Sequence, residues 1–298
     1  MRHDCVRTAH RRRTIRLVLA LCLLVVSGAQ AEPQRIVSTS PSITEVLFAL
    51  GLGPRVVGVS NYCEYPPQVK DLPKVGTFLR PDPELIARLR PDLVILHKFP
   101  NDLTDRLDAL HIPYAVADQG GLTDAYTEIQ QIGAAAGVRA QAEELVAKIR
   151  SRLQQIRSQS IKEKKMSVVF VIGREPGTLS GLITVGRDLF LNELIEVAGG
   201  TNSIAKDSPQ PYPHVSLETI LRINPDVLID MGDMGTSPQE RERKAVEDQR
   251  LWKQVPNLSA VKNDRVYSLT STAFVVPGPR ATEAAEVLFT LLHGKKPE

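Results

Sequence analysis

The feature that most constrains the fold is a twelve-residue motif that occurs twice. Residues 84–95 and residues 218–229 both read Glu-x-Ile-x-Arg-apolar-x-Pro-Asp-x-x-Ile without a gap. Asp82 and Ser216, each two residues before its glutamate, are suitable N-caps, so each copy is predicted to open as a short helix. The proline ends that helix, and the β-branched apolar run after it predicts a buried strand.

A second, weaker pair supports an internal duplication. Glu45 leads an apolar turn that reaches Gly51, and Glu193 leads a similar turn that reaches Gly199, with the same six-residue step. The first helix starts either at Ser40 with Pro41 at its first position, or at Ser42 with Glu45 as a capping box. The second is predicted over residues 187–197. Two copies are too few for a solenoid, so they predict two similar α/β lobes.

Between the two copies lies a long amphipathic stretch, residues 139–160. Its apolar side chains recur at three- and four-residue steps and form one stripe on a helix. At 1.5 Å per residue, such a helix is roughly 30 Å long. The members of the stripe are Ala142, Leu145, Val146, Ile149, Leu153 and Ile156. Its position between the copies predicts that this helix bridges the two lobes and packs along both.

The predicted fold class is therefore α/β, with two similar lobes joined by one long central helix and a ligand cleft between the lobes. Strands that alternate with helices indicate mainly parallel sheets covered on both faces. The predicted boundaries are a signal peptide over 1–31, an N-terminal lobe over 32–138, the bridging helix over 139–165 and a C-terminal lobe over 166–298.

The first 31 residues have the order of a secretory signal peptide. Six arginines precede the apolar run Leu17 to Val26, and Ala29-Gln30-Ala31 follows it. The run has ten residues, too few to span a bilayer. Two variants stay open: lipidation at Cys22, although Leu21 before it is large for such a cleavage site, and twin-arginine export through Arg12-Arg13.

Removing this leader changes the charge balance of the chain. The leader holds six arginines and one aspartate, so 31 of the 37 basic and 33 of the 34 acidic side chains belong to the rest. The apparent basicity lies in the leader, and nothing indicates a nucleic-acid partner. Cys63 is then the single cysteine, which excludes an internal disulfide. We expect it to be a buried, small apolar residue.

Candidate ligand-binding residues follow from the rule that ligands of open α/β sheets lie beyond the carboxyl ends of strands. Aromatic residues make up only 5% of the chain, so their concentration in strand-end loops is informative. They indicate a cleft for a sizeable, flat, partly apolar ligand. The candidates are Tyr62, Phe78 and His97 in the first lobe, and Arg174, Thr178, Tyr212 and Phe274 in the second.

The same residues allow other interpretations. His97 and His214 stand at comparable places in the two halves, so a metal pair or a periplasmic metal-dependent enzyme stays an alternative. However, the sequence contains no Gly-x-Ser-x-Gly elbow, no phosphate-binding loop with lysine and no His-Glu-x-x-His. We therefore expect a protein that is not an enzyme, with no catalytic residues, no metal site and no cofactor of its own. A sensory receptor with the same fold is a third alternative.

Several segments, taken in order, resemble one known family. Arg35-Ile36-Val37-Ser38, Ser40-Pro41-Ser42-x-Thr44-Glu45, Tyr62-x-x-Tyr65-Pro66-Pro67, the two Pro-Asp motifs and Ala198-Gly199-Gly200 resemble periplasmic binding proteins for cobalamin and ferric-siderophore uptake. The resemblance covers essentially the whole chain after the leader. It implies two lobes bridged by a rigid helix, a periplasmic location, a monomer, and delivery of a metal chelate to an ABC importer in the inner membrane.

The resemblance also implies roles for individual residues. Glu84 and Glu218 match the glutamate on each lobe that meets arginines of the permease subunits. Tyr62, Phe78 and Tyr212 match aromatic contacts to the corrin in the cobalamin branch. His97 stands where that branch has a tryptophan, and the loop 271–276 lacks its Asp/Arg pair. A corrinoid is therefore the preferred ligand, with haem, ligated by His97 or a tyrosine, and a ferric siderophore as alternatives.

Overall fold

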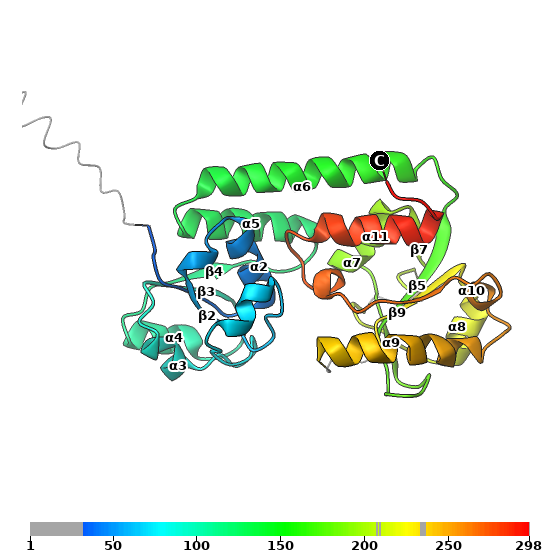
Figure 1. The fold of residues 1–298 in the computed structure, drawn as a ribbon, viewed down its shortest axis with the longest axis horizontal. Helices are drawn as coiled ribbons and strands as arrows, with labels where there is room; N and C mark the ends of the chain where they lie inside the picture. The colour runs from blue at the N-terminus through cyan, green and yellow to red at the C-terminus, as the bar shows by residue number, and fades with distance from the viewer. Residues whose placement is uncertain (1–31, 207, 209, 233–236, 298) are drawn as a thin grey trace, which may run out of the picture. The chain divides into compact units, whose positions relative to one another are not determined.

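The strands of the first lobe form one parallel sheet. The computed structural model describes residues 32–206, 208, 210–232 and 237–297. In the sheet of the first lobe the order is β2-β1-β3-β4, and every pairing is parallel (Figure 1). Its strands are β1 (Ile36–Ser38), β2 (Val56–Val59), β3 (Leu93–His97) and β4 (Tyr114–Ala117).

The second lobe repeats this arrangement and adds to it. Four of its strands pair in parallel in the order β7-β5-β9-β10, which is the order of the first sheet. They are β5 (Met166–Gly173), β7 (Gly200–Asn202), β9 (Val227–Asp230) and β10 (Val266–Ser268). The far half of β5 pairs antiparallel with β6 (Leu182–Thr184), which pairs with β8 (His214–Val215). The prediction of mainly parallel sheets is confirmed, and this short antiparallel extension was not expected.

The repeated twelve-residue motif folds in the same way in both lobes. It forms α3 (Pro83–Arg88) before β3 and α8 (Leu217–Ile223) before β9, with Asp82 and Ser216 as the predicted N-caps. The motif aspartates also have equivalent partners. Asp92 accepts a 2.8 Å hydrogen bond from the backbone N–H of Arg35 before β1, and Asp226 accepts one of 2.8 Å from Ser167 in β5. Each Pro-Asp pair thus fixes the start of the neighbouring strand.

The weaker pair is equivalent as well. Helices α2 (Pro41–Ala49) and α7 (Phe190–Val197) both end before a glycine with positive φ, 78° at Gly51 and 86° at Gly199. Ser40 is the N-cap of α2, which decides between the two predicted starts. The predicted start of α7 at Arg187 is wrong by three residues. Asp188 has a φ of 58°, in the left-handed region, so the helix cannot include it.

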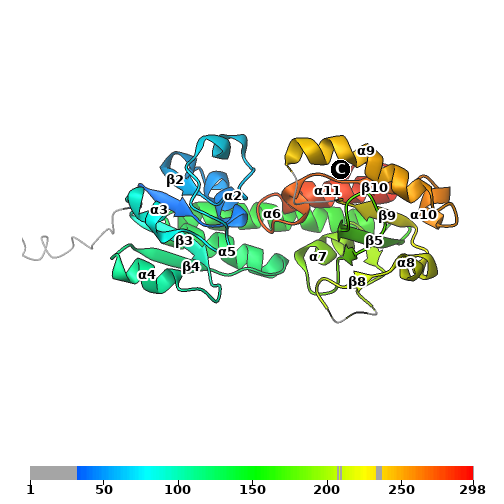
Figure 2. The same ribbon diagram turned by 90° about the horizontal axis from the view of Figure 1, so that it is seen from below.

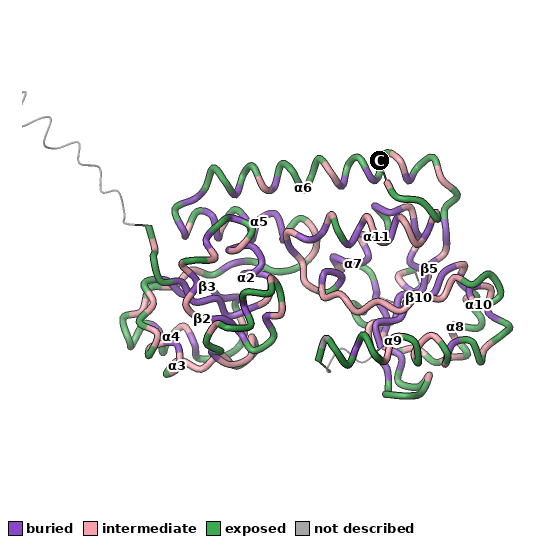
Figure 3. The backbone as a smooth tube through the Cα atoms, viewed as in Figure 1, coloured by how far each residue is buried: buried purple, intermediate pink, exposed green. Residues whose placement is uncertain are grey.

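Helix α6 (Arg139–Ser160) has 22 residues and packs against both lobes. It lies along α5 (Leu122–Ala135) in the first lobe and along α7 and α11 (Ala281–His293) in the second (Figure 1). Its buried stripe faces these helices, while the opposite side is exposed (Figure 3). The buried side chains are Ala142, Val146, Ile149, Leu153, Ile156 and Ser160, with Leu145 partly buried.

One hydrophobic core continues under α6 from one lobe into the other. Strand residues alternate between this shared core and a separate core on the far face of each sheet, as a period of two requires. In β1, Ile36 belongs to the shared core and Val37 to the far core of the first lobe. In β5, Val168 and Val169 divide in the same way. Because the lobes share a core, the predicted packing of α6 along both of them is confirmed.

The remaining helices cover the far faces of the sheets (Figure 2). The far core of the first lobe includes residues of α3 and α4, and that of the second includes residues of α8, α9 and α10. The elements not yet given are α4 (Leu103–Ala109), α9 (Pro238–Lys253), α10 (Ser259–Lys262) and the 3-10 turns η1 (Gly53–Arg55), η2 (Pro67–Asp71) and η3 (Thr272–Phe274).

Residues 34–298 belong to one compact unit. Within the part of the chain that the structure describes, no helix is both long and apolar enough to cross a membrane. The predicted signal peptide, with Cys22, lies outside the described residues. The exact boundaries of the two lobes stay a prediction.

Candidate functional site: a cleft between the lobes

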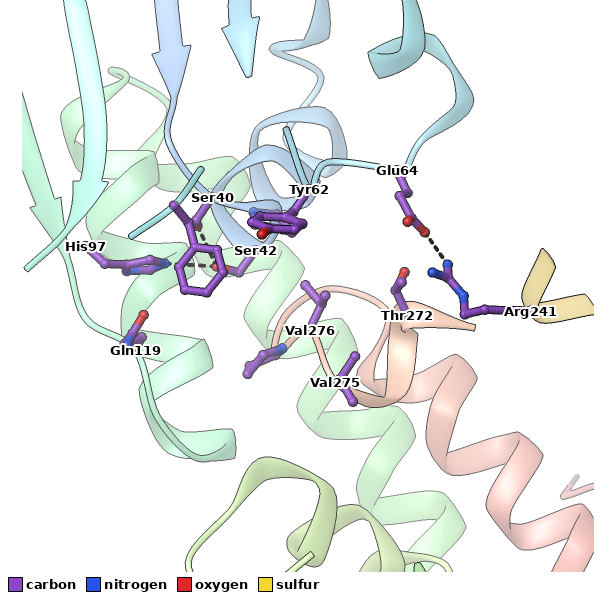
Figure 4. Close-up of a pocket in the computed structure, with 13 residues that line it drawn as sticks. Ser40, Ser42, Tyr62, Glu64, His97, Gln119, Arg241, Thr272, Val275 and Val276 are labelled. Carbon is purple, nitrogen blue, oxygen red and sulfur yellow. Dashed lines mark hydrogen bonds and ion pairs between the residues drawn. The ribbon is translucent and has the colours of Figure 1, made fainter. Parts of the chain in front are cut away.

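A cavity of about 390 Å³ lies between the carboxyl ends of the two sheets (Figure 4). The first lobe lines it with the start of α2, the loop after β2, Phe78 and the ends of β3 and β4. The second lobe contributes the start of α9 and the loop around η3. The lining residues are Ser40, Pro41, Ser42, Tyr62, Glu64, Phe78, His97, Gln119, Arg241, Thr272, Val275, Val276 and Pro277. Its volume is within the range of small-molecule sites.

The first lobe presents a chain of aromatic rings to this cleft. The rings of Tyr62 and Phe78 meet edge to face with centroids 5.6 Å apart. Phe99 lies behind them, 5.7 Å from Phe78 and 6.5 Å from the imidazole of His97. These distances are typical of favourable aromatic pairs. Three of the seven predicted ligand-binding residues, Tyr62, Phe78 and His97, are thus brought together in one cavity.

His97 forms part of a buried polar cluster at the floor of the cleft. Its Nδ1 lies 3.0 Å from the carbonyl oxygen of Ala117, and its Nε2 lies 3.0 Å from Ser42 Oγ. Ser42 Oγ lies 2.8 Å from Glu128 Oε1, which is itself 3.4 Å from His97 Nε2. Both ring nitrogens of His97 are therefore occupied, and ligation of a metal by Nε2 requires displacement of Ser42.

Burial disfavours a charge on this cluster. Desolvation raises the pKa of the Glu128 carboxyl to about 8, since its side chain is 1% exposed, and the hydrogen bond from Ser42 offsets only part of this. Desolvation also lowers the pKa of His97, against the effect of its hydrogen bond to Ala117. The floor below the aromatic wall is thus polar, and burial favours its neutral form.

The second lobe closes the cleft with an apolar loop and one cation. Val275, Val276 and Pro277 face the aromatic wall, as Figure 4 shows for the two valines. Arg241, at the start of α9, donates a 2.6 Å hydrogen bond to Glu64 of the first lobe. This ion pair spans the cleft and is one of its few charged features.

A second ion pair joins the lobes behind the η3 loop. Arg280, just before α11, donates two hydrogen bonds of 2.8 and 2.5 Å to the carboxylate of Glu45 in α2. Its guanidinium also lies 4.3 Å from the centre of the Tyr65 ring. Desolvation raises the pKa of the Glu45 carboxyl, and Arg280 opposes that rise. Tyr65 therefore packs against the protein rather than into the cleft.

Two further predicted residues lie beside the cleft. Tyr212 and Phe274 line a smaller hollow of about 70 Å³ that shares Val275 and Pro277 with the main cavity. Phe274 is buried, with its ring 6.1 Å from that of Phe170, so it supports the loop from below. Tyr212 is half exposed at the edge.

Arg174 and Thr178 are not brought into this cavity. Arg174 is buried in the second lobe, where it donates a 2.9 Å hydrogen bond to Asp230 and pairs with Asp248 of α9. Asp230 also accepts a 2.7 Å bond from the indole of Trp252. Thr178 is an exposed loop residue whose carbonyl accepts from Arg174. This cluster ties α9 to the sheet.

Comparison with known proteins settles the family. The periplasmic binding protein family matches residues 36–273, and a substrate-binding lipoprotein of an ABC transporter from Bacillus subtilis is 31% identical over 86% of this chain and 79% of its own. The chain belongs to the periplasmic binding protein family. It is a substrate-binding component of the ABC transporter type, and its relatives are transport proteins. The resemblance and the predicted fold are confirmed, and membership implies an extracytoplasmic location.

Other similar members of the family differ in their named ligands. A vitamin B12-binding protein of Vibrio cholerae is 28% identical over 93% of this chain and 97% of its own. Its solved structure has a TM-score of 0.72 over 88% of this chain and 97% of that one. A periplasmic haem-binding protein of Roseiflexus has a TM-score of 0.75 at 27% identity, over 88% of this chain and 98% of its own.

Within this periplasmic binding protein, the predicted docking glutamates and the second candidate metal-binding histidine lie outside the cleft. Glu84 and Glu218 are exposed in the first turns of the equivalent helices α3 and α8. His214 is exposed in β8 and lines a different cavity of the second lobe. His97 and His214 thus line different cavities. Among the described residues, no group of three His, Cys, Asp or Glu side chains is arranged for a metal ion.

The prediction for Cys63 is confirmed, because it is buried and unpaired in the described chain. Its thiol lies 3.1 Å from the hydroxyl of Thr44. Desolvation raises its pKa to about 11, so it is a poor nucleophile.

Several residues that line the cleft or lie directly behind it were not predicted from the sequence. Gln119 follows β4, so the strand-end rule applies to it. Glu128 shares the spacing of Ala125, Ile129 and Ile132 on α5, and a lone acid on an apolar helix face is a usable signal. Arg241 carries no such signal, because the helix around it is highly charged throughout.

Proposed function

We propose that this periplasmic binding protein captures a flat metal macrocycle in the cleft, with a corrinoid as the first candidate. The observation that carries the proposal is the pairing of an aromatic wall on one lobe with an apolar loop on the other. Tyr62 and Phe78 lie on one side of a cavity of about 390 Å³, and Val275, Val276 and Pro277 lie on the other. Aromatic and apolar walls with few polar groups suit a planar, partly apolar ligand better than a small, strongly polar solute.

The rim of the cleft supports a ligand that projects beyond it. Tyr62 is 55% exposed and Val275 is 41% exposed, so large apolar side chains stand at the opening. Exposed apolar surface of this kind is typical of a binding site that a ligand later covers. A corrinoid, whose macrocycle carries bulky side groups, is compatible with such an opening. The named ligand of the Vibrio cholerae relative points in the same direction.

Haem is the second candidate, and a specific feature favours it. Arg241 and Glu64 form the ion pair that spans the cleft. A ligand carboxylate, such as a haem propionate, can replace Glu64 as the partner of Arg241. The phenol of Tyr62, at the rim, is a group that can ligate haem iron. A corrinoid with amide side groups has less need of the Arg241 cation.

A ferric siderophore is the third candidate.

The proposal extends to delivery of the ligand to a permease in the inner membrane. Glu84 and Glu218 are exposed and occupy equivalent helices of the duplicated lobes. A permease with two similar subunits needs one similar charge on each lobe, and exposed acids suit arginines on the partner. We infer a monomeric receptor in the periplasm, exported by a cleaved leader, without catalytic residues or a resident cofactor.

The mechanism we propose is capture with limited lobe movement. The shared core and the continuous helix α6 oppose hinge bending more than loop linkers do. The ion pair between Glu45 and Arg280 adds a buried link between the lobes. Binding thus relies on a preformed cleft, and little free energy is spent on rearrangement.

The test is a titration of the mature protein, residues 32–298, with cyanocobalamin, haemin and ferrichrome in separate experiments. Trp252 is the single tryptophan of the chain, so its fluorescence and the ligand absorbance give two independent signals. We expect one ligand, cyanocobalamin first, to bind tightly with one-to-one stoichiometry. Absence of binding to all three ligands would contradict the proposed function.

A further inference from the structure

The polar cluster at the floor of the cleft is built from three separate elements. Ser42 belongs to α2, His97 ends β3 and Glu128 lies in α5. Ser42 and His97 line the cleft, whereas Glu128 lies behind them with 1% of its side chain exposed. A buried carboxyl beside a ligand site is costly unless it has a specific partner. Its arrangement with Ser42 and His97 therefore requires an explanation.

Counting the protons of this cluster shows that one more is needed than the hydroxyl supplies. His97 Nδ1 faces a carbonyl oxygen at 3.0 Å and must donate to it, so Nε2 of a neutral imidazole is an acceptor. An ionised Glu128 is also only an acceptor. The Ser42 hydroxyl has a single proton, and its oxygen lies within 3.0 Å of both His97 Nε2 and Glu128 Oε1. Without another proton, the Ser42 hydroxyl satisfies only one of these two acceptors, and the other faces it at 3.4 Å without a donor.

We propose that Glu128 is a positioning residue of the ligand site that carries this additional proton. Protonation reverses the hydrogen bond that Ser42 donates to an ionised Glu128. The protonated carboxyl then donates to Ser42 Oγ, the Ser42 hydroxyl donates to His97 Nε2, and His97 Nδ1 donates to the carbonyl of Ala117. Each of these three hydrogen bonds then joins one donor to one acceptor, and the cluster holds no net charge. The proton fixes the orientation of the two groups that the ligand meets.

The surroundings of Glu128 favour the neutral carboxyl. Glu45 from α2 and Asp118 after β4 both oppose its ionisation through their negative charge. From α6, Arg150 lies over the ring of Tyr126, 4.5 Å from its centre. From α7, Glu193 accepts a hydrogen bond from the backbone at the start of α5. The groups that act on Glu128 itself are thus acidic, and burial acts in the same direction.

The consequence for binding is a loss of affinity in alkaline solution. This step rests on the proposed function, because it takes the cleft as the ligand site. A macrocycle that covers Ser42 and His97 removes the remaining water from the floor. A negative charge on Glu128 then becomes more costly, so the ligand binds the protonated form better. By linkage, the Kd of the wild type rises by up to about tenfold per pH unit above the pKa of Glu128.

The proton itself can be tested without any ligand. Infrared difference spectra of wild type against Glu128→Gln should contain the C=O band of a protonated carboxyl at pH 7, sensitive to deuterium exchange and lost by pH 9.5. Glu143→Gln changes an exposed acid of α6 and should leave that band in place. Absence of the band at pH 7 would overturn the proposal, whether or not any chelate binds.

The effect on binding is tested with cyanocobalamin between pH 6.5 and 9.5. Glu128→Gln supplies an amide donor in place of the carboxyl proton, so we expect wild-type affinity at pH 7 and a flat pH profile. Wild type and Glu143→Gln should lose affinity above pH 8. A wild-type Kd that is constant or falls above pH 8 contradicts the proposal. Lack of binding at every pH, with the infrared band present, instead refutes the proposed ligand.

Discussion

The two lobes use the same repeated elements for different purposes. In both, a buried polar residue ends the strand of the repeated motif, His97 in β3 and Asp230 in β9. In the first lobe this residue lines the cleft and belongs to a hydrogen-bonded cluster with Ser42 and Glu128. In the second lobe it is paired with Arg174 and Trp252 away from the cleft. A duplicated sheet thus provides the floor of the cleft in one lobe and an anchor for α9 in the other.

The difference explains how each lobe contributes to the cleft. The first lobe supplies rings and polar groups from strand ends, held directly by its sheet. The second supplies Arg241 from α9 and the loop after η3. The charged cluster around Arg174 fixes α9, and Phe274 supports the loop from below. The second lobe therefore needs a separate scaffold for its cleft residues.

The largest effect is expected from breaking that scaffold. Arg174→Met leaves the buried Asp230 and the partly buried Asp248 without their cation, which should cost about 3–5 kcal/mol of unfolding free energy. Urea unfolding measures the loss. Lys148→Met, which removes an exposed pair with Glu144 on α6, is the matched control and should change little. A loss below about 1 kcal/mol for Arg174→Met would show that the cluster is not the anchor described.

The neutral cluster of the first lobe should produce an unusual dependence of stability on pH. The folded pKa of Glu128, about 8, is above its unfolded value of 4.5, so the folded state holds an extra proton between them and stability falls as pH rises. His97 has the opposite effect, but only below its unfolded pKa of 6.5, because its folded pKa is lowered. Between these limits, from pH 6.5 to 8, only Glu128 of these two groups contributes to the slope.

Over that window we expect wild type to lose about 2 kcal/mol of unfolding free energy relative to Glu128→Gln, at about 1.4 kcal/mol per pH unit for one proton. Urea unfolding of both proteins at several pH values gives the difference. If the unfolding free energies of the two proteins change with pH in parallel, the pKa of Glu128 is not raised in the folded state. The contrast between a neutral cluster around His97 and a charged cluster around Arg174 would then be lost.

Removing one ring of the aromatic wall should have a moderate effect. Phe78→Ala removes contacts to the ligand and to Tyr62, and we expect an affinity loss of about 1–2 kcal/mol, or roughly tenfold in Kd. The measurement is a titration with the chelate that binds wild type. Leu79→Ala, next in the chain and 53% exposed, should bind like wild type. Equal affinities for wild type and Phe78→Ala would place the ligand elsewhere.

The smallest effect on the isolated protein is expected for Glu84 and Glu218, the exposed glutamates that both lobes share. Glu84→Ala and Glu218→Ala change exposed helix residues, so ligand affinity should not change. Uptake, assayed with the permease in proteoliposomes, should fall to a similar extent for each variant and disappear for the pair. Glu143→Ala on α6 is the control and should transport normally. Weakened ligand binding in either variant would rule out a role restricted to docking.

Much of the duplicated framework could be predicted from the sequence, because its signals are local. The N-caps Asp82 and Ser216, the prolines and the two helix-ending glycines each act within a few residues of the chain. The stripe of α6 is a pattern of one helix. The aromatic wall also followed from the position of Tyr62 and Phe78 in strand-end loops.

The rest depends on partners distant in the chain. Strands β6 and β8 have three and two residues, too few for an alternating pattern, and exist only because β5 is long enough to pair with β6. Arg241 belongs to a charged helix that looks solvated until Glu64, 177 positions away, is placed beside it. Arg174 lies in a strand-end loop and was therefore predicted to bind the ligand. Only the fold shows that its guanidinium is paired with Asp230 and Asp248.

The central claim is that the two different faces of the duplicated lobes together hold a metal macrocycle. A crystal structure of residues 32–298 grown with cyanocobalamin, or with haemin if that ligand binds instead, tests it most directly. We predict the macrocycle between Tyr62 and Phe78 on one side and Val275 to Pro277 on the other, above Ser42 and His97. A ligand bound outside this cleft, or an empty cleft at saturating concentrations of both compounds, would contradict the account.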